Sequence, residues 1–264
     1  MFEVLLLAIA FIGGSAAGLW DLKTSDIPDK VVIAMIILGI VFNSFETVLS
    51  GDVSYIRNSL LAGLGFLAFG LLIYFLGQWG DGDAALFSAF GFLLPNVSFN
   101  YFINLFFVSA AYTIIYSLIF AYKENLYPAF FLKIKGNTKP ISIIFLALLI
   151  IILPFAATNM IYVYVPVMAI GLYFVYRFLR FIEDSGFYRK INSKYLKVGD
   201  VIGEDIPKLK LYSKLIRGLT QTEINKIRKI KKHVYVRDGV RSGIVFPINL
   251  LITIIYGNVL LVIL

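Results

Sequence analysis

Residues 77–87 read GQWGDGDAALF and interrupt sequence that is otherwise suited to lipid. This segment separates the apolar run Ser59–Leu76 from another that begins at Ala84, and it carries two aspartates and three glycines. An aspartate at the centre of a bilayer costs about 2.5–3.5 kcal/mol on insertion scales, so intramembrane acids usually serve a function. Asp81 and Asp83 therefore make this segment the first candidate for a functional site.

The composition places the whole chain in the membrane class. Of its 264 residues, 59% are hydrophobic and 15% are charged, whereas about a quarter of a soluble globular domain is charged. The absence of cysteine excludes disulfides and cysteine-ligated zinc. A single histidine, His233, disfavours a histidine metal site and Ser–His chemistry. We expect no metal and no cofactor, and carboxylates are the leading candidates for acid–base catalysis.

The net charge of +8 is concentrated near the C-terminus. Residues 184–244 contain 15 Lys and Arg against 6 Asp and Glu. Nucleic-acid binding is one interpretation of this excess. Cytoplasmic segments of membrane proteins are enriched in Lys and Arg and lie close to anionic lipid, which is the better interpretation. We therefore expect anionic headgroups, and no nucleic acid, as the partner of this region.

Apolar segments define the candidate membrane spans, each of which needs about 20 residues. The candidates are Phe2–Trp20, Val31–Leu49, Ser59–Leu76, Ala84–Pro95, Tyr101–Tyr122, Ile141–Pro154, Ile161–Phe181 and Phe246–Leu264. The fourth would rise only about 18 Å of a core roughly 30 Å thick, so its polar start should lie inside protein. The sixth is also short, and the expected number of spans is therefore six to eight.

The distribution of Lys and Arg among the loops predicts the orientation. Two lie in residues 21–30, four in 122–140 and seventeen in 177–241, whereas the opposite side has only Arg57. The positive-inside rule then places the N-terminus outside the cell membrane. It also brings Asp21 and the GDGD segment to the cytoplasmic face.

The predicted fold is an α-helical polytopic membrane protein of six to eight spans, with a short fourth helix and a small cytoplasmic α+β domain. We assign residues 1–183 to a membrane-embedded catalytic helical bundle and residues 184–243 to the basic cytoplasmic domain. Residues 244–264 are expected to form a C-terminal transmembrane helix.

Two β-rich strings and a helix signal suggest the structure of the small domain. KYLKVGDVI (194–202) and HVYVRDGV (233–240) combine β-branched and aromatic residues with bounding glycines, which predicts strands. Thr220 and Glu223 match a capping box that opens a short basic helix, INKIRKIKK. A unit of about 60 residues has marginal stability alone.

Asp21 ends the first span and Asp83 begins the short fourth one, so the two carboxylates should meet at one face. Like charges a few ångströms apart do not both ionise readily, and one retains a proton. The ionised partner can then take a proton from an attacking water while the other donates to a peptide carbonyl. Gly80 and Gly82 can adopt positive φ and allow close approach of another backbone.

Other interpretations of these residues remain open at this point. GDGD is a common loop string, an aspartate at a helix start is usually a cap, and Asp21 could pair with Lys23 at the interface. Intramembrane acids also mark proton or ion pathways in transporters and channels. Proteolysis and proton-coupled transport stand level on these grounds, although transport predicts acids at several depths and this pair lies at one face. A catalytically inactive scaffold is a third class.

Gly80-Asp81-Gly82-Asp83 at the start of a membrane helix is the GxGD motif of aspartic membrane proteases. Presenilins and signal peptide peptidases share the motif, but they carry a later Pro-Ala-Leu that this chain lacks. The chain resembles the type IV prepilin peptidase family, and most closely its archaeal preflagellin/prepilin branch. The resemblance lies in the order of three features: an aspartate at the end of span one, then Ile27-Pro28-Asp29, then WGDGDAAL. GLTQTEINKIR, VYVRDGVRSG and the final span resemble the C-terminal region of archaeal members.

The resemblance implies that Asp21 and Asp83 are the catalytic pair, that Gly80 and Gly82 shape the active-site loop, and that Asp81 occupies a variable position. The implied activity is an aspartic endopeptidase that removes the short basic leader of preflagellin- or prepilin-like precursors, proteins of the archaellum or type IV pilus. The substrate's apolar helix would lie in the membrane. Bacterial relatives often add a cysteine-rich segment and a methyltransferase activity, which a cysteine-free chain is not expected to have.

Several neighbouring residues are secondary candidates. Lys23 and Trp79 could contact substrate or anchor the membrane interface. Asp26 and Asp29 could bind a basic leader, but Ser25–Pro28 is more typical of a helix cap with a first-turn proline.

Overall fold

The structure is a computed structural model that describes residues 2–135, 161–213, 218–237 and 239–263. The predicted span Ile141–Pro154 lies outside these residues, so the total number of spans stays a prediction. The chain divides into two compact units, which are described separately.

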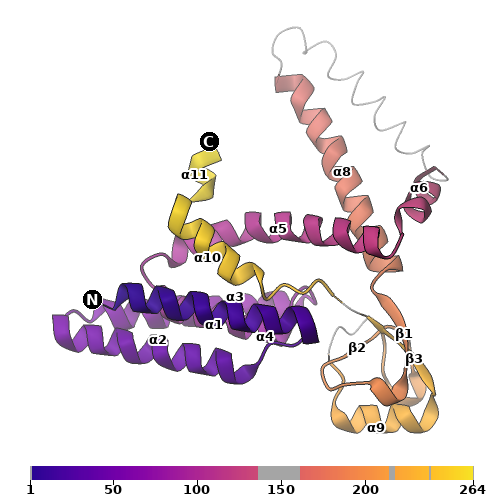
Figure 1. The fold of residues 1–264 in the computed structure, drawn as a ribbon, viewed down its shortest axis with the longest axis horizontal. Coiled ribbons are helices and arrows are strands. Elements are labelled where there is room, and N and C mark those ends of the chain that lie inside the picture. The colour runs from indigo at the N-terminus through magenta and orange to yellow at the C-terminus, as the bar shows by residue number, and fades with distance from the viewer. Residues whose placement is uncertain (1, 136–160, 214–217, 238, 264) are drawn as a thin grey trace. The chain divides into compact units, whose positions relative to one another are not determined.

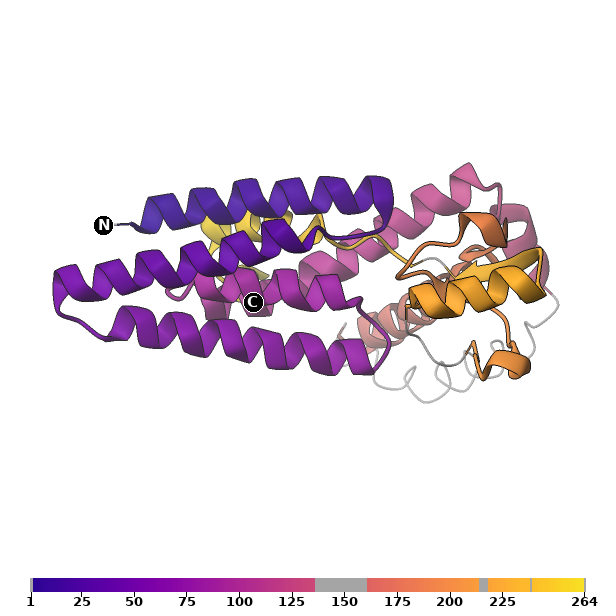
Figure 2. The same cartoon turned by 90° about the horizontal axis from the view of Figure 1, so that it is seen from below.

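The first unit contains most of the long apolar helices and comprises residues 2–112 and 240–263. Its helices are α1 (Glu3–Thr24), α2 (Asp29–Ser50), α3 (Ser54–Phe75), α4 (Asp81–Leu93), the first part of α5 (Ser98–Lys123), α10 (Val245–Tyr256) and α11 (Val259–Ile263). Figures 1 and 2 show α1, α2 and α3 lying lengthwise beside one another and beside α4. Among the described residues, α1, α2, α3 and α5 are long and apolar enough to cross a membrane.

The short helix α4 lies inside the bundle, as expected for a segment that cannot span lipid. Nine of its thirteen residues are buried, and all of them follow the acidic first turn. At its other end, the Phe92 carbonyl accepts hydrogen bonds from Asn43 of α2 (3.2 Å) and Ser59 of α3 (2.7 Å). These side chains satisfy backbone that would otherwise be unpaired at membrane depth.

Small residues allow α3 and α4 to pack backbone against backbone. A Cβ atom at Gly91 would lie 2.6 Å from the carbonyl oxygen of Ala62. A Cβ at Gly70 would lie 2.9 Å from the Cα of Ala84. Only glycine fits such approaches, a common feature of helix pairs in membranes.

The predicted C-terminal helix over 244–264 is interrupted. The chain forms α10 and α11 with Gly257 between them, at a φ of +65° that favours glycine. Asn104 of α5 donates to the Gly257 carbonyl at 2.6 Å and accepts from the Val259 amide at 2.9 Å. The apolar sequence predicts one helix, whereas this buried amide stabilises the break.

The second unit comprises residues 113–135, 161–213, 218–237 and 239. It contains the end of α5, α6 (Tyr127–Lys135), α8 (Ile161–Ser185), α9 (Gln221–Ile230), the single turns η1 (Ser193–Tyr195) and η2 (Pro207–Leu209), and the strands β1 (Tyr188–Asn192), β2 (Val201–Ile202) and β3 (His233–Arg237). The strands form an antiparallel sheet in the order β1-β3-β2.

The sequence predicted some of these elements. The capping box is present, since the Thr220 hydroxyl accepts from the Glu223 amide and the Glu223 carboxylate accepts from the Thr220 amide. HVYVRDGV contains β3. KYLKVGDVI begins in the 3-10 turn η1, continues as an irregular stretch over 196–200 and ends in the two-residue β2. β1 was not predicted, because its residues YRKIN are largely polar.

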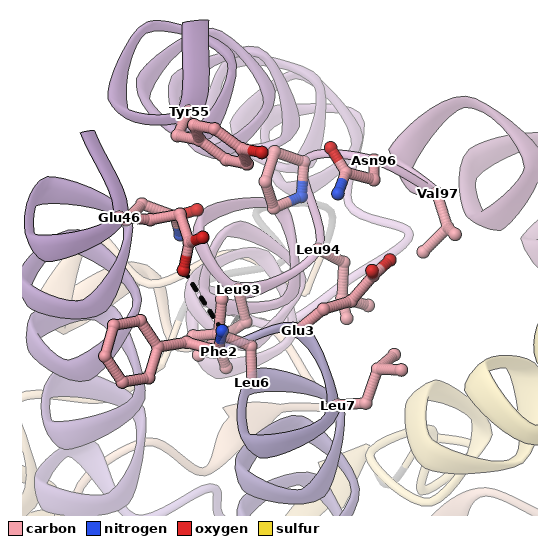
Figure 3. Close-up of a pocket in the computed structure, with 12 residues that line it drawn as sticks. Phe2, Glu3, Leu6, Leu7, Glu46, Tyr55, Leu93, Leu94, Asn96 and Val97 are labelled. Atoms are coloured by element: carbon pink, nitrogen blue, oxygen red, sulfur yellow. Dashed lines mark hydrogen bonds between the residues drawn. The ribbon is translucent and has the colours of Figure 1, made fainter. Parts of the chain in front are cut away.

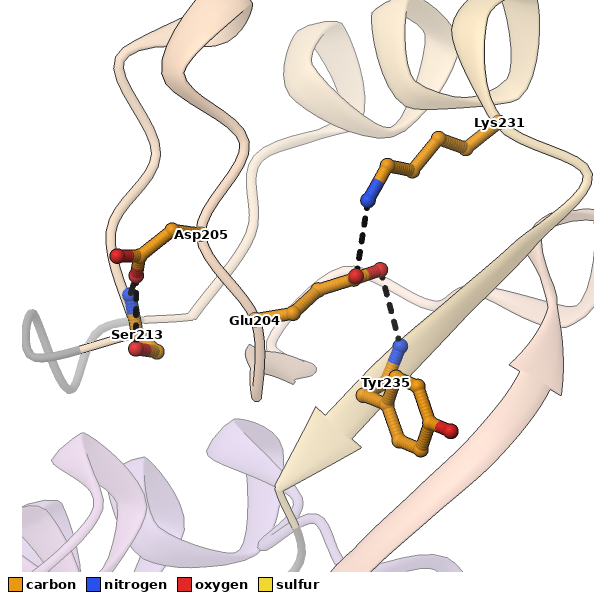
Figure 4. Close-up of polar contacts among 5 residues, drawn as sticks. All are labelled: Glu204, Asp205, Ser213, Lys231 and Tyr235. Atoms are coloured by element: carbon orange, nitrogen blue, oxygen red, sulfur yellow. Dashed lines mark hydrogen bonds and ion pairs between the residues drawn. The ribbon is translucent and has the colours of Figure 1, made fainter.

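Buried apolar residues and polar contacts hold this sheet and α9 together. Ile224, Ile227 and Val234 are fully buried in its core. Glu204 accepts from the Lys231 ammonium at 2.8 Å and from the Tyr235 amide at 3.3 Å (Figure 4). The figure also shows Asp205 binding the amide and hydroxyl of Ser213, at 2.7 and 2.8 Å.

Candidate active site

Asp21 is a buried carboxylate near the C-terminal end of α1. Only 7% of the surface of this residue is exposed. The amide of Gly243 donates to Asp21 Oδ2 at 2.9 Å. The chain at Gly243 crosses α1 closely, because a Cβ at Gly18 would lie 2.9 Å from the Gly243 carbonyl carbon.

Asp83 lies in the first turn of α4 and uses both carboxylate oxygens. Oδ2 accepts from the Gly80 amide at 3.1 Å, which is the capping contact expected of an acid three residues into a helix. Oδ1 accepts from the Ser242 hydroxyl at 2.8 Å. Capping therefore accounts for only one of its two contacts.

Asp21 and Asp83 are brought together by two consecutive residues. Ser242 binds Asp83 and Gly243 binds Asp21. Two aspartates that are distant in the sequence thus share one site at the ends of α1 and α4.

Burial raises the pKa of Asp83 from 3.8 to about 6. Loss of solvation is the largest cause, and the negative charges of Asp21 and Asp81 raise the pKa further. Hydrogen bonds from Ser242 and Gly80 favour the ionised form and lower it. A carboxyl with this pKa exchanges its proton close to neutral pH, as acid–base catalysis requires.

The glycines of the GDGD string act differently from the prediction. Neither Gly80 nor Gly82 has positive φ; Gly80 is extended, and in this stretch Gly77 alone has positive φ, +72°. Gly82 lies inside α4, where a Cβ would come 2.9 Å from the Cβ of Ile27. Gly82 thus lets the loop after α1 pack against the start of α4.

The remaining sequence candidates lie around the pair. Asp81 is exposed, and its carboxylate accepts from the Gly82 amide. Lys23 is exposed, and the positive charge that acts on Asp21 is that of Arg241. Trp79 packs edge-on against Phe87 and Phe246, at ring centroid distances of 5.6 and 5.8 Å, which gives it a structural role.

Asp26 does not cap the second helix, contrary to the prediction. α2 begins at Asp29 with Pro28 at the N-cap position and no side-chain cap. Ser25 instead ends α1, with a φ of +58° and its amide bonded to the Asp21 carbonyl. Asp26 is exposed, and its negative charge acts on Asp21.

A pocket at the opposite end of the bundle has different chemistry. Figure 3 shows it lined by Glu3, Glu46 and Tyr55 among apolar side chains, with Glu46 accepting the Phe2 amide at 3.1 Å. Glu3 and Asp21 are 18 positions apart on α1, about 27 Å along the helix, so this pocket is distinct from the aspartate pair. The described residues contain no group of three His, Cys, Asp or Glu that could hold a metal ion.

Ser242 and Gly243 are site residues that the sequence patterns did not predict. They belong to the string VYVRDGVRSG and directly precede the last apolar segment. The distribution of Lys and Arg predicts that this junction lies at the same face as Asp21 and Asp83. Polar and small residues at the span ends on that face are the sequence signal that points to these two positions.

Comparison with known proteins covers the part of the chain that holds both aspartates. The sequence model of the type IV leader peptidase family matches residues 6–118. The preflagellin peptidase of Methanocaldococcus jannaschii is 31% identical over 87 residues, which are 33% of this chain and 37% of that protein. The chain is thus aligned with little more than a third of the length of this relative, and no solved structure matches. These matches confirm the resemblance of residues 6–118 to the type IV leader peptidase family. Four of the described helices are also long and apolar enough to cross a membrane.

Proposed function

We propose that this protein is an aspartic endopeptidase that removes the short basic leader of preflagellin- or prepilin-like precursors at the cytoplasmic face of the membrane. The observation that carries the proposal is the pairing of Asp21 and Asp83 through Ser242 and Gly243. The family match over residues 6–118 supports a leader peptidase, because it includes both acids.

The reaction uses one proton shared by the pair. The ionised carboxylate takes a proton from water as the water oxygen attacks the scissile carbonyl carbon. The protonated carboxyl donates its proton to the carbonyl oxygen, which gives a neutral tetrahedral intermediate. The carboxyl that took the proton from water then donates it to the leaving nitrogen, while the other carboxylate accepts a proton from a hydroxyl of the intermediate. The C–N bond breaks, and the pair again holds one proton. The pKa of about 6 at Asp83 allows this residue to serve as the protonated member.

The charges around the pair suit a basic leader. Asp26 and Asp81 are exposed, and their charges act on Asp21 and Asp83 respectively. A leader rich in Lys and Arg would meet these acids at the cytoplasmic face while its apolar helix docks against the membrane helices. Charge reversal at Asp26 should raise KM for such precursors, and the effect should weaken at high salt.

The basic region 184–243 has a separate role in this proposal, because it repels a basic leader. Its exposed lysines suit anionic headgroups: Lys190, Lys194, Lys197, Lys208, Lys210, Lys226, Lys229 and Lys232. Each basic residue near an anionic membrane surface contributes about 1 kcal/mol. This region would hold the enzyme to the cytoplasmic leaflet.

A cleavage assay in membranes tests the proposal. The substrates are several precursors with a Lys/Arg-rich leader ahead of an apolar helix, incubated with wild type, Asp21→Asn, Asp83→Asn and the control Asp81→Asn. Wild type and the control should release the leader, and the first two variants should not. Cleavage by both Asn variants would overturn the dyad, and no product from wild type with any precursor would overturn the activity.

A further inference from the structure

The segment Arg241–Gly243 is held by contacts to α1, α5 and α10. The Arg241 guanidinium donates to the Leu22 carbonyl at the end of α1, and the Arg241 carbonyl accepts from the Tyr112 hydroxyl at 2.7 Å. The Ser242 carbonyl accepts from the amide of Val245, at the start of α10. Three independent contacts therefore hold the backbone from which Ser242 and Gly243 reach the two acids.

We propose that Ser242 and Gly243 form a clip that positions the Asp21–Asp83 pair for catalysis. The clip rests on the proposed function, but it lies outside residues 6–118, the part that matches the family. Ser242 and Gly243 act through the aspartates, so they are positioning residues.

Gly243 is suited to the clip because it has no side chain. A Cβ at this position would lie 3.1 Å from both the Cβ and Oδ2 of Asp21, and 3.3 Å from the Cα of Gly18. The Gly243 amide reaches the Asp21 carboxylate because no side chain fills the space between this residue and α1. A main-chain donor on a buried, anchored backbone fixes the orientation of Asp21 without a flexible side chain.

Ser242 supplies the matching contact on the other acid. Its hydroxyl and the Gly80 amide bind different oxygens of Asp83, which fixes the plane of that carboxyl group. Since the two donors of the clip are adjacent in the chain, they also fix the separation of the two acids. Misplacement of a catalytic group by about 1 Å can cost 100-fold in rate, so this separation matters for turnover.

The geometry of the clip can be tested without any enzyme assay. The chain contains no cysteine, so the pair Asp21→Cys and Gly243→Cys introduces the only two thiols. Cβ atoms of a disulfide are about 3.5–4.5 Å apart, and these positions are 3.1 Å apart, so a small adjustment suffices. The pair should cross-link on mild oxidation in membranes, and failure to do so would overturn the clip. The control pair Asp21→Cys and Gly65→Cys should not cross-link, since a Cβ at Gly65 has no neighbour within 4 Å.

The role of the clip is tested with Ser242→Ala in the cleavage assay. We expect kcat to fall about tenfold or more with KM within about twofold, because the lost contact acts on the reacting groups. The pH–rate profile should move to higher pH, since the Ser242 hydroxyl lowers the pKa of Asp83. Ser242→Thr should restore both, and Ser98→Ala, which loses only a contact to the Pro95 carbonyl, should match wild type.

The outcomes distinguish the clip from the proposed function. An unchanged kcat and pH profile in Ser242→Ala would overturn positioning, and a faster variant would make the clip an inhibitory latch instead. If wild type cleaves no precursor, the proposed function fails, and the clip is judged by labelling of protonated Asp83 with a carbodiimide across pH. Labelling should extend to higher pH in Ser242→Ala, and no shift would overturn the clip.

Discussion

Replacement of Asp83 by Asn should abolish cleavage and yet stabilise the folded protein at neutral pH. The pKa of Asp83 is about 6 in the folded state, against 3.8 for the free side chain. Between these values the folded state binds more protons than the unfolded state, so the free energy of unfolding falls as pH rises. The full effect is about 3 kcal/mol above pH 6, and it vanishes below pH 4. Asn is neutral and close in shape, so Asp83→Asn removes this penalty.

Thermal unfolding in detergent, measured from pH 4 to pH 8, checks the prediction. Asp83→Asn should melt at the same temperature as wild type near pH 4 and several degrees higher at pH 7.5. Asp81→Asn is the matched control: this neighbouring acid is exposed and its charge is the smallest influence on the pKa of Asp83, so its melting temperature should exceed that of wild type only slightly at pH 7.5. A variant that is less stable than wild type at pH 7.5, or a difference independent of pH, would refute the argument that burial disfavours the ionised carboxylate.

Two further substitutions test the packing of the bundle. Gly91→Ala should destabilise the first unit by about 1–3 kcal/mol, because its Cβ would lie 2.6 Å from the Ala62 carbonyl oxygen; the midpoint of thermal unfolding measures this. Asn104→Leu should make residues near the α10–α11 break more accessible to hydrogen exchange, because the Gly257 carbonyl and the Val259 amide both lose a partner.

The control for Gly91→Ala lies on α3, the helix that packs against α4. Gly65→Ala, with no neighbour near its Cβ, should leave stability unchanged or raise it by up to about 1 kcal/mol. Equal effects at Gly65 and Gly91 would contradict the close approach of α3 and α4. Unchanged exchange in Asn104→Leu would show that Asn104 does not stabilise the break.

Local sequence accounts for the helices and for the choice of aspartates. Apolar segments near 20 residues predict α1, α2, α3 and α5, because every backbone group must be paired inside lipid. The interruption of the apolar sequence at GDGD predicts the start of α4. Asp21 and Asp83 lie at the ends of spans, and the distribution of Lys and Arg in the loops predicts that these ends share one face. The structure shows the two aspartates bound to the consecutive residues Ser242 and Gly243, while their catalytic role stays a proposal.

Contacts between distant segments decide the details of the site. Ser242 is 159 positions from Asp83 and Gly243 is 222 from Asp21, and no local pattern reports such a pairing. Glycine is likewise favoured at position 82 because the side chain of Ile27 packs against it, and its φ is not positive. The sequence by itself determined the membrane class, the helices and the two acids, because these depend on hydrophobicity and on the chemistry of single residues. Only the tertiary structure decided what holds the acids together, because that depends on which backbones pack within reach of a hydrogen bond.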